Sequence, residues 1–453
     1  MAQPAPDAVR PKMTREEIED RYATGDRDFT FLDLSHIDLS RLDLREGDFK
    51  GSDLTRAKLY ETHFEGADLS DCNLEGTFLT KTWMSGAQAR RTRFAKANMK
   101  GFAVEQLDAQ DADFRGANLE DAAFTECKLR RTHFNEVNLT GAHFLRCRVY
   151  GASFNGNLEN VKLERSKLKQ VRWRQVEAKG AYVWGTSFEG ALLQDVDFSE
   201  AQMQHTDFDD AQFEHSNFDQ AQLVKCRLRQ AQLANTRFLE ATFSETDFSR
   251  ALLENANFTG AKFAGSVLAG ADLTRASFRS ADLRGADFRG ADLTGGDVTG
   301  AEVDRTTNLE GTRTTGIDFA TNWPFRVQVN RCAHDMTIQH FRRTRPVLGF
   351  LWTILLGNGK ANWLPVIWCI ALILLFALLM AWQPGSFDFG HENPTFIDHL
   401  ADSFGVFVTL DFLLDRGNDT FGRGVLLAEM LSSYLVLGFI AGLFSKLFPS
   451  PPE

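Results

Sequence analysis

The feature that most constrains this chain is a large apolar residue that returns at every fifth position from Phe29 to Val303. The first phase contains 26 five-residue units and ends at Phe154; one residue is then lost near Asn157, and a second phase of 30 units starts at Leu158. A period of five matches neither the 3.6-residue period of an α-helix nor the two-residue period of a strand. Self-similarity of this kind predicts a solenoid of stacked coils.

Each unit also carries a small residue two places before its apolar centre, as in Gly66-Ala67-Asp68-Leu69. These A-D/N-L-x-x units resemble the pentapeptide-repeat family. The resemblance implies an all-β solenoid, a right-handed four-sided β-helix with four units per coil. The 56 units at residues 29–303 then form 14 coils, and a strand spacing of roughly 4.8 Å gives a rod about 65 Å long. One large and one small inward residue per unit predict a packed interior.

Charge is distributed unevenly along this repeat. The chain has a net charge of −11, yet residues 81–180 contain 19 basic and 11 acidic residues, whereas residues 181–303 contain 10 basic and 19 acidic ones. This asymmetry is typical either of a solvated mixed-charge surface or of an electrostatic docking face for a protein partner. Six cations follow the lost residue: Lys162, Arg165, Lys167, Lys169, Arg172 and Arg174. Basic residues beside Trp173 could indicate nucleic-acid contacts, but the register places Trp173 inside and argues against nucleic acid.

The six cysteines do not indicate a metal site. Four of them occupy the small inward slot of a unit, where a free thiol packs as a small hydrophobe: Cys72, Cys127, Cys147 and Cys226. Cys127 and Cys147 should lie on neighbouring coils as a reduced pair. No C-x-x-C occurs and the ten histidines do not cluster, so no zinc is expected. No nucleophile–base pair or phosphate-binding glycine loop stands out, which argues against an enzyme and against a cofactor.

Residues 1–28 precede the repeat and form a tail and a short helix. Thr14 and Glu17 have capping-box spacing, which predicts a helix that continues to about Tyr22. We expect this helix to cover the open edge of the first coil, which would otherwise template aggregation.

Two weak centres, Ala89 and Ala109, lie twenty residues apart and therefore on one side of adjacent coils. Either larger neighbours fill the space beside these alanines or a small cavity remains there, and filling is favoured because interiors rarely keep voids. The candidates are Trp83, Met84, Met99 and Phe102.

Beyond Val303 the repeat decays, and residues 304–345 are expected to form a linker and a basic segment beside a membrane. The cations of this basic segment are Arg326, Arg331, Arg342, Arg343, Arg345 and Lys360. A membrane domain is expected at residues 346–453, with an interfacial part at 346–357 and spans at 363–382 and 425–448. The positive-inside rule places the rod in the cytoplasm of a bacterium, on the inner or plasma membrane.

The segment between the two spans contains a pore-loop-like region at residues 395–417. Its helix, from Thr395 to Leu410, is too short to cross a bilayer and too apolar to lie in water, so we expect it to be re-entrant. The arrangement resembles the two-helix pore-loop, potassium-channel-like family, and in particular bacterial proteins with a preceding pentapeptide domain. The likeness rests on Leu351-Trp352, Leu355-Leu356-Gly357, Leu374 to Leu378, Val406 to Leu410 and Gly422-Arg423. It implies a tetrameric cation channel in the lipid membrane.

The filter departs from the family's glycine-rich pattern, because no glycine occurs between Thr409 and Asp415. The candidate pore residues are Thr409, Leu410, Asp411, Phe412 and Asp415. In a tetramer, rings of Asp411 or Asp415 would favour inorganic cations. Gly438 and Gly442 in the second span indicate either close helix packing or a gating hinge. The alternative to a channel is a non-conducting anchor that oligomerises and displays the rod as a protein-interaction scaffold.

Overall fold

The computed structural model describes residues 10–344, 364–382 and 395–409, together with the single residues 425, 427, 428 and 431. The chain divides into two compact units, Met1–His334 and Asp335–Glu453. Each unit is described by itself.

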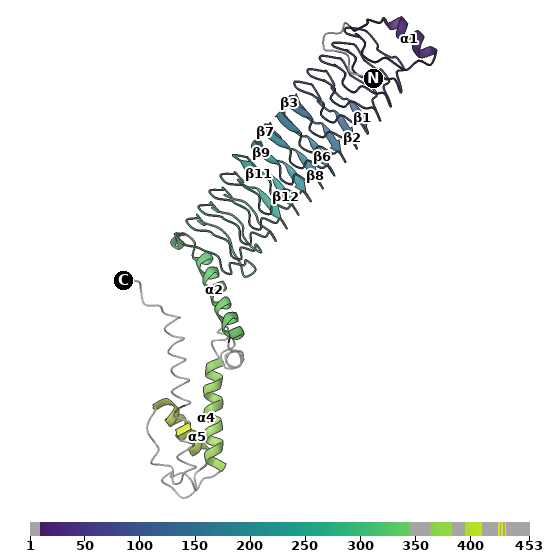
Figure 1. Ribbon diagram of the computed structural model, residues 1–453. Helices are drawn as coiled ribbons and strands as arrows, with labels where there is room; N and C mark the ends of the chain where they lie inside the picture. The colour runs from purple at the N-terminus through teal and green to yellow at the C-terminus, as the bar shows by residue number, and fades with distance from the viewer. Residues whose placement is uncertain are drawn as a thin grey trace. The chain divides into compact units, whose positions relative to one another are not determined.

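The first unit is a solenoid with one coil for every twenty residues (Figure 1). Fourteen successive parallel bridges connect Asp28, through Asp48 and Asp68, to Asn308. Three further ladders of bridges run beside this one, offset by five, ten and fifteen residues. The predicted all-β solenoid is therefore confirmed.

In the middle of the rod the extended segments are long enough to form short parallel strands, which pair into two sheets (Figure 1). The eight-stranded sheet has the order β1-β2-β4-β6-β8-β10-β12-β13, and the five-stranded sheet has the order β11-β9-β7-β5-β3. The strands are β1 (Ala103–Glu105), β2 (Ala123–Thr125), β3 (His133–Asn138), β4 (His143–Leu145), β5 (Ser153–Asn157), β6 (Lys162–Glu164), β7 (Arg172–Glu177), β8 (Tyr182–Trp184), β9 (Leu192–Asp197), β10 (Gln202–Gln204), β11 (Gln212–Glu214), β12 (Gln222–Val224) and β13 (Thr242–Ser244).

The repeat places two side chains of every unit in the interior. The centres, such as Phe49 and Phe124, and the small residues before them, such as Ala67, are fully buried. Identical positions on successive coils stack, so the rings of Phe94 and Phe114 lie with their centroids 4.7 Å apart. Trp173 and the four cysteines in small slots are buried as the register predicts.

The residue lost near Asn157 is accommodated at one corner of the solenoid. Strand β5 has five residues where its neighbours β3 and β7 have six, and the pairing shifts so that Gly156 lies opposite Val137. Gly156 has a φ of +124°, and a Cβ added there would lie 2.4 Å from the carbonyl oxygen of Val137. Only glycine fits this corner without displacing the backbone.

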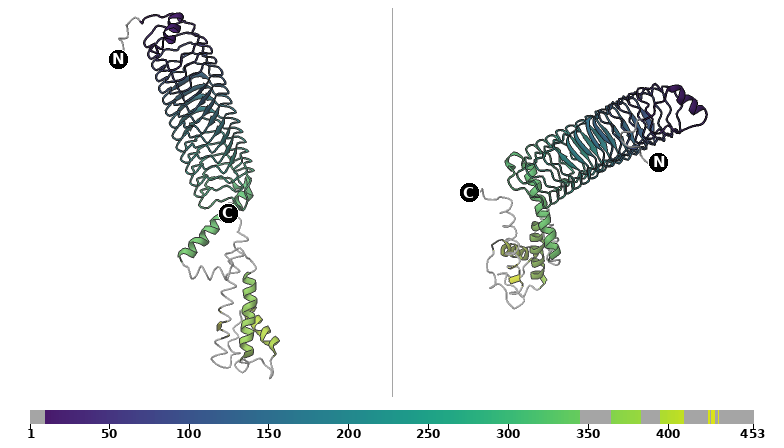
Figure 2. Two further views of the ribbon diagram at one scale, coloured as in Figure 1. Left: turned by 90° about the vertical axis from the view of Figure 1, so that its right-hand side faces the viewer. Right: turned by 45° about the horizontal axis from the view of Figure 1, so that its top comes forward.

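Helix α1 (Arg15–Ala23) closes the N-terminal end of the solenoid (Figure 2). The predicted capping box is present, because the Thr14 hydroxyl accepts from the Glu17 amide and the Glu17 carboxylate accepts from the Thr14 amide. Ile18 is fully buried, and the Tyr22 ring stacks on Phe29 with a centroid separation of 5.5 Å. The helix thus covers the first coil with apolar contacts.

The C-terminal end is closed by η1 (Phe319–Thr321) and the first turns of α2 (Trp323–Thr344). Bridges continue past Val303, to Asn308 and Arg313. The amide of buried Asn322 then donates to the carbonyls of Val298 and Ala301, both at 2.7 Å. These hydrogen bonds satisfy backbone acceptors that the missing next coil would have paired.

The space beside Ala89 and Ala109 is filled by only some of the predicted residues. Met84, Met99 and Phe102 are fully buried. Trp83 is 42% exposed and stacks on His63 with a centroid separation of 4.3 Å, so its expected inward position is wrong. Trp83 immediately precedes the centre Met84, and its side chain therefore points away from the interior column.

In the second unit, helices α4 (Leu364–Trp382) and α5 (Phe396–Thr409) pack together. The hydroxyl of buried Ser403 donates to the carbonyl of Ile373 at 3.0 Å. Within the described part of the chain, no helix has both the length and the apolar character needed to cross a bilayer. The structure therefore does not show the two-span membrane domain expected from the sequence. The second expected span, at 425–448, falls almost entirely outside the described residues, and so does the interfacial part at 346–357.

Candidate functional site

The candidate site is a column of cations on one side of the solenoid, which we call the basic ladder. It consists of Lys128, Arg148 and Lys167, which occupy the same outward position on three successive coils. A parallel β-bridge pairs the backbone of Lys128 with that of Arg148. Another pairs Arg148 with Lys167 across the shortened coil. Each of these residues precedes a buried centre, so its side chain points away from the interior.

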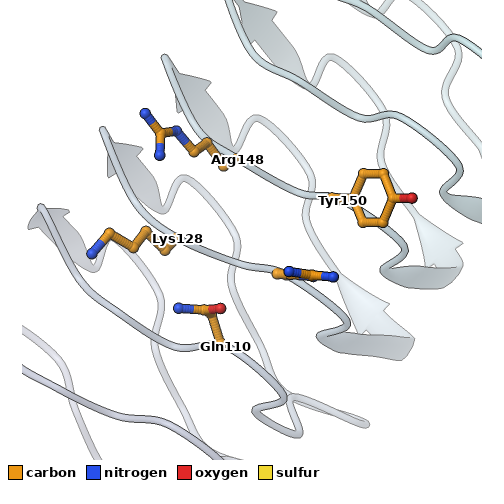
Figure 3. A pocket seen from close by; sticks show the side chains of 5 residues that line it. Gln110, Lys128, Arg148 and Tyr150 are labelled. Carbon is orange, nitrogen blue, oxygen red and sulfur yellow. The ribbon is translucent and has the colours of Figure 1, made fainter.

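A shallow hollow of about 450 Å³ lies beside the first two cations of the basic ladder. It is lined by Gln110, Lys128, Arg130, Arg148 and Tyr150 (Figure 3). The guanidinium of Arg130 lies 5.4 Å from the centroid of the Tyr150 ring, and the Tyr150 hydroxyl donates to the side chain of Gln170. The hollow therefore combines three cations, an amide and an ordered aromatic ring.

The carboxylate nearest to these cations, that of Asp108, already accepts hydrogen bonds from other side chains. Asp108 is buried and accepts from Arg90 at 2.8 Å and from Gln110 at 2.9 Å. Burial acts to raise the pKa of Asp108, but these hydrogen bonds and the charges of Arg90 and Lys128 outweigh it, so the pKa is lowered. Lys128 lies 3.5 Å from the same carboxylate. Asp108 is thus ionised at neutral pH and is shared among several donors.

The remaining cations of the site have no such partner. Among the residues that the structure describes, Arg130, Arg148 and Lys167 form no ion pair with a carboxylate. Farther along the same side of the rod the pattern is different: Arg227 lies 2.5 Å from Asp207, and Arg229 lies 2.6 Å from Asp209. Like charges directly opposite each other on paired strands are destabilising. Asp108 relieves this repulsion at Lys128, but no carboxylate among the described residues does so at Arg148 and Lys167.

The sequence did not identify this column, although it did indicate a basic middle. The six cations that follow the lost residue go to different sides of the rod, since Lys162 starts β6 and Arg172 starts β7, while Lys167 lies between these strands. Among these six, only Lys167 belongs to the basic ladder. A search for like charges spaced by one coil of twenty residues, reduced to nineteen across the lost residue, would have found the column.

Most residues predicted as pore candidates lie outside the described part of the chain. Thr409 is the last residue of α5. The others, which lie outside the described residues, are Leu410, Asp411, Phe412, Asp415, Gly438 and Gly442. Of the basic segment, Arg326 and Arg343 are exposed residues of α2, Arg331 is half-buried, and Arg342 belongs to the same helix. Arg345 and Lys360 are outside the described residues.

No cluster of metal-ligating side chains occurs among the residues that the structure describes. Burial raises the pKa of the Cys72 and Cys226 thiols, and the contact with Cys127 together with burial raises the pKa of the Cys147 thiol. For Cys226 the pKa rises to about 11. Such thiols are poor nucleophiles at neutral pH.

Two family models match the chain. The model described as pentapeptide repeats matches residues 28–60, 62–101, 117–156, 221–260 and 256–295, and the model described as a pentapeptide repeat region matches residues 155–228. The chain belongs to the pentapeptide-repeat family. Proteins of this family are typically structural or interaction proteins and not enzymes.

Solved structures similar to this chain include the pentapeptide-repeat proteins HetL and Rfr23. HetL, a protein involved in heterocyst differentiation regulation in the cyanobacterium Nostoc sp. strain PCC 7120, is 24% identical over 65% of this chain and 98% of its own, with a TM-score of 0.16. Rfr23 from the cyanobacterium Cyanothece 51142 is 30% identical over 20% of this chain and 58% of its own, with a TM-score of 0.17. QnrB1, a plasmid-mediated fluoroquinolone resistance protein, is 18% identical over 55% of this chain and 97% of its own, with a TM-score of 0.19. No curated protein matches the chain significantly.

Proposed function

We propose that the solenoid is a protein-interaction scaffold and that the basic ladder is its docking site for an acidic protein surface. The observation that supports this is the stack of Lys128, Arg148 and Lys167 on paired coils. Arg148 and Lys167 have no carboxylate partner among the described residues. A protein that tolerates unrelieved repulsion at one place commonly does so for function.

The geometry also favours a protein surface over a small molecule. The hollow is open on one side and its cations are spread along the rod, so they are arranged to meet several carboxylates at once. The guanidinium of Arg130 contacts the Tyr150 ring, and a guanidinium restrained in this way loses less side-chain entropy when it pairs with a carboxylate. Contacts of this kind raise the rate and the specificity of association.

Titration with a fluorescent glutamate-rich peptide tests this proposal. Binding should weaken in Arg148→Ser and Lys167→Ser, while unfolding stability should stay the same or rise because repulsion is removed. Arg227→Ser is the matched control, because Arg227 lies on the same side but is held by Asp207 and Asp209. A lysine-rich peptide should not bind. If the glutamate-rich peptide fails to bind the wild-type chain, the basic ladder is not a docking site.

For the second unit we make a separate proposal, namely that a tetramer of this chain conducts cations. It rests on Leu410, Asp411, Phe412 and Asp415, which the structure does not describe. The alternative is that the unit anchors and oligomerises the scaffold at a lipid membrane, with the rod in the bacterial cytoplasm. Current recordings in planar bilayers separate the two: cation current that falls in Asp411→Asn or Asp415→Asn supports a pore, and the absence of current contradicts it.

A further inference from the structure

The side of the rod opposite the basic ladder carries a second column of like charges, and its sign is negative. Glu177 at the end of β7 pairs directly with Asp197 at the end of β9. The bridges continue from Asn138 through Asn157 to these two residues. Glu177 follows Lys167 by ten residues, which is half a coil, so the two side chains point away from opposite sides of the four-sided solenoid.

This acidic side is only partly neutralised. Glu177 is exposed and has no ion-pair partner among the described residues. Asp197 accepts hydrogen bonds from the Ser199 amide and the Asn217 side chain, but from no cation. The nearby Lys179 is held by Glu200 at 3.0 Å. Lys179 also acts electrostatically on Asp197, so the repulsion between Glu177 and Asp197, which we call the acidic pair, is only partly relieved.

We propose that the acidic surface recognised by the basic ladder is the acidic pair of a second copy of this chain. This inference rests on the proposed function, because it names the partner of the same docking site. Two copies have the same rise per coil, about 4.8 Å, so Arg148 and Lys167 of one copy meet Glu177 and Asp197 of the next without loss of register.

The contact connects opposite sides of the rod, so a sideways translation generates it. A translation keeps neighbouring rods parallel, and a shift along the axis of about 7 Å, one and a half coils, aligns the two charged columns. Because the two surfaces differ, the contact is heterologous and does not close into a dimer. We therefore expect open lateral rows of rods that grow with protein concentration.

Zero-length carbodiimide cross-linking of the full chain tests this contact directly. Lys167 and Glu177 of one chain lie on opposite sides of the rod, so a bond between their side chains can form only between two copies. Chains labelled with ¹⁵N and unlabelled chains are mixed at about 0.05 M salt, and cross-linked peptides are identified by mass spectrometry. Mixed-isotope links from Lys167 to Glu177 or Asp197 are expected, and they should decrease at about 1 M salt. The absence of these links in the wild-type chain overturns the inference.

Charge-reversal variants provide a second, independent test of this contact. In the double variant Arg148→Glu/Lys167→Glu, both surfaces of the contact are acidic. In the double variant Glu177→Lys/Asp197→Asn, neither surface is acidic. Each variant alone should lose lateral association, by roughly a hundredfold or more in dissociation constant, while an equimolar mixture should recover it. Circular dichroism confirms that each variant is folded. Lys262→Glu is the control: Lys262 is an exposed cation elsewhere on the rod, opposite Asp282, and this variant should associate like the wild type.

The two proposals fail in different ways. If the glutamate-rich peptide binds the basic ladder but wild-type chains neither cross-link nor associate, the docking site stands and the second copy is not its partner. If mixing the two variants fails to restore association, the pairing of these two sides is wrong even where the wild type oligomerises through another surface. If the peptide does not bind the wild-type chain, the docking site and the inference that rests on it are both overturned.

Discussion

The rings of Phe238 and Phe258 lie parallel on adjacent coils, with centroids 4.8 Å apart and planes inclined by 5°. Both rings are fully buried. The separation equals the spacing of paired strands, so each coil delivers one ring to the same column. This stacking links the five-residue period of the sequence to the cohesion of the rod.

Replacing Phe258 by alanine should destabilise the solenoid by about 3–5 kcal/mol, because the change leaves a cavity in a filled column. Denaturant unfolding of the full chain followed by circular dichroism measures this loss. Phe78→Ala is the control: Phe78 is 52% exposed in an outward position, so its removal should change stability by no more than about 0.5 kcal/mol. Equal effects of the two substitutions would contradict the inward and outward assignment.

The register of the solenoid could be predicted from the sequence because it depends only on the identity of every fifth residue. Phe258 and Ala67 follow from this rule, and the capping box of Thr14 follows from local spacing. The size of a side chain does not predict its position as well: Trp83 is large enough to fill the space beside Ala89, but it is 42% exposed. The register itself puts Trp83 outside.

The candidate site could not be predicted in the same way. Whether a cation on the surface is paired depends on neighbours twenty residues away and on the rotamers that connect them. Arg148 lies opposite Lys167 only because one residue is missing between their coils. Arg227, by contrast, lies opposite Asp207, twenty residues earlier, and forms an ion pair with it. The sequence shows an excess of charge, but it does not show which charges remain without a partner.

The C-terminal closure of the rod depends on one buried amide. Asn322 donates to two carbonyls, and its own carbonyl oxygen accepts from the Phe325 amide at 3.1 Å. Asn322→Leu leaves the Ala301 carbonyl and the Phe325 amide without these hydrogen bonds, which should cost about 1–3 kcal/mol. Hydrogen exchange followed by mass spectrometry should show faster exchange in the last coils, around Val298 and Ala301, and unchanged exchange at the N-terminal end. Asn330→Leu, at an exposed position of α2, is the matched control.

Acid should weaken a contact near the N-terminal end of the rod. The guanidinium of Arg45 donates to both oxygens of Asp43 and lowers the pKa of that carboxyl group to about 2. In the unfolded chain an aspartate has a pKa of about 3.9, so the native state favours the charged form. The stabilisation is therefore complete above about pH 5 and is lost as the pH falls from about 4 to 2.

Melting temperatures of the wild type and of Asp43→Asn measure this effect. Asparagine removes the charge and keeps the size of the side chain. The difference between the two melting temperatures should be constant from about pH 7 to 5 and should shrink below about pH 4. The difference will be small, since both side chains are more than half exposed and solvent screens the pair. A difference that persists unchanged at pH 2 would show that the charge of Asp43 is not its source.

Alanine substitutions at two glycines with positive φ distinguish the loss of stability caused by steric conflict from the loss caused by backbone conformation. A Cβ at Gly156 would lie 2.4 Å from the Val137 carbonyl oxygen, whereas a Cβ at Gly86, where φ is +72°, would meet no atom within 4 Å. Gly86→Ala should cost about 1–2 kcal/mol, the price of a left-handed residue with a side chain. Gly156→Ala should cost clearly more, because the backbone of β5 must move away from β3 and weaken the corner where one residue is missing. Denaturant unfolding compares the two variants. Equal losses would mean that this corner is adaptable and that the bulge does not require glycine.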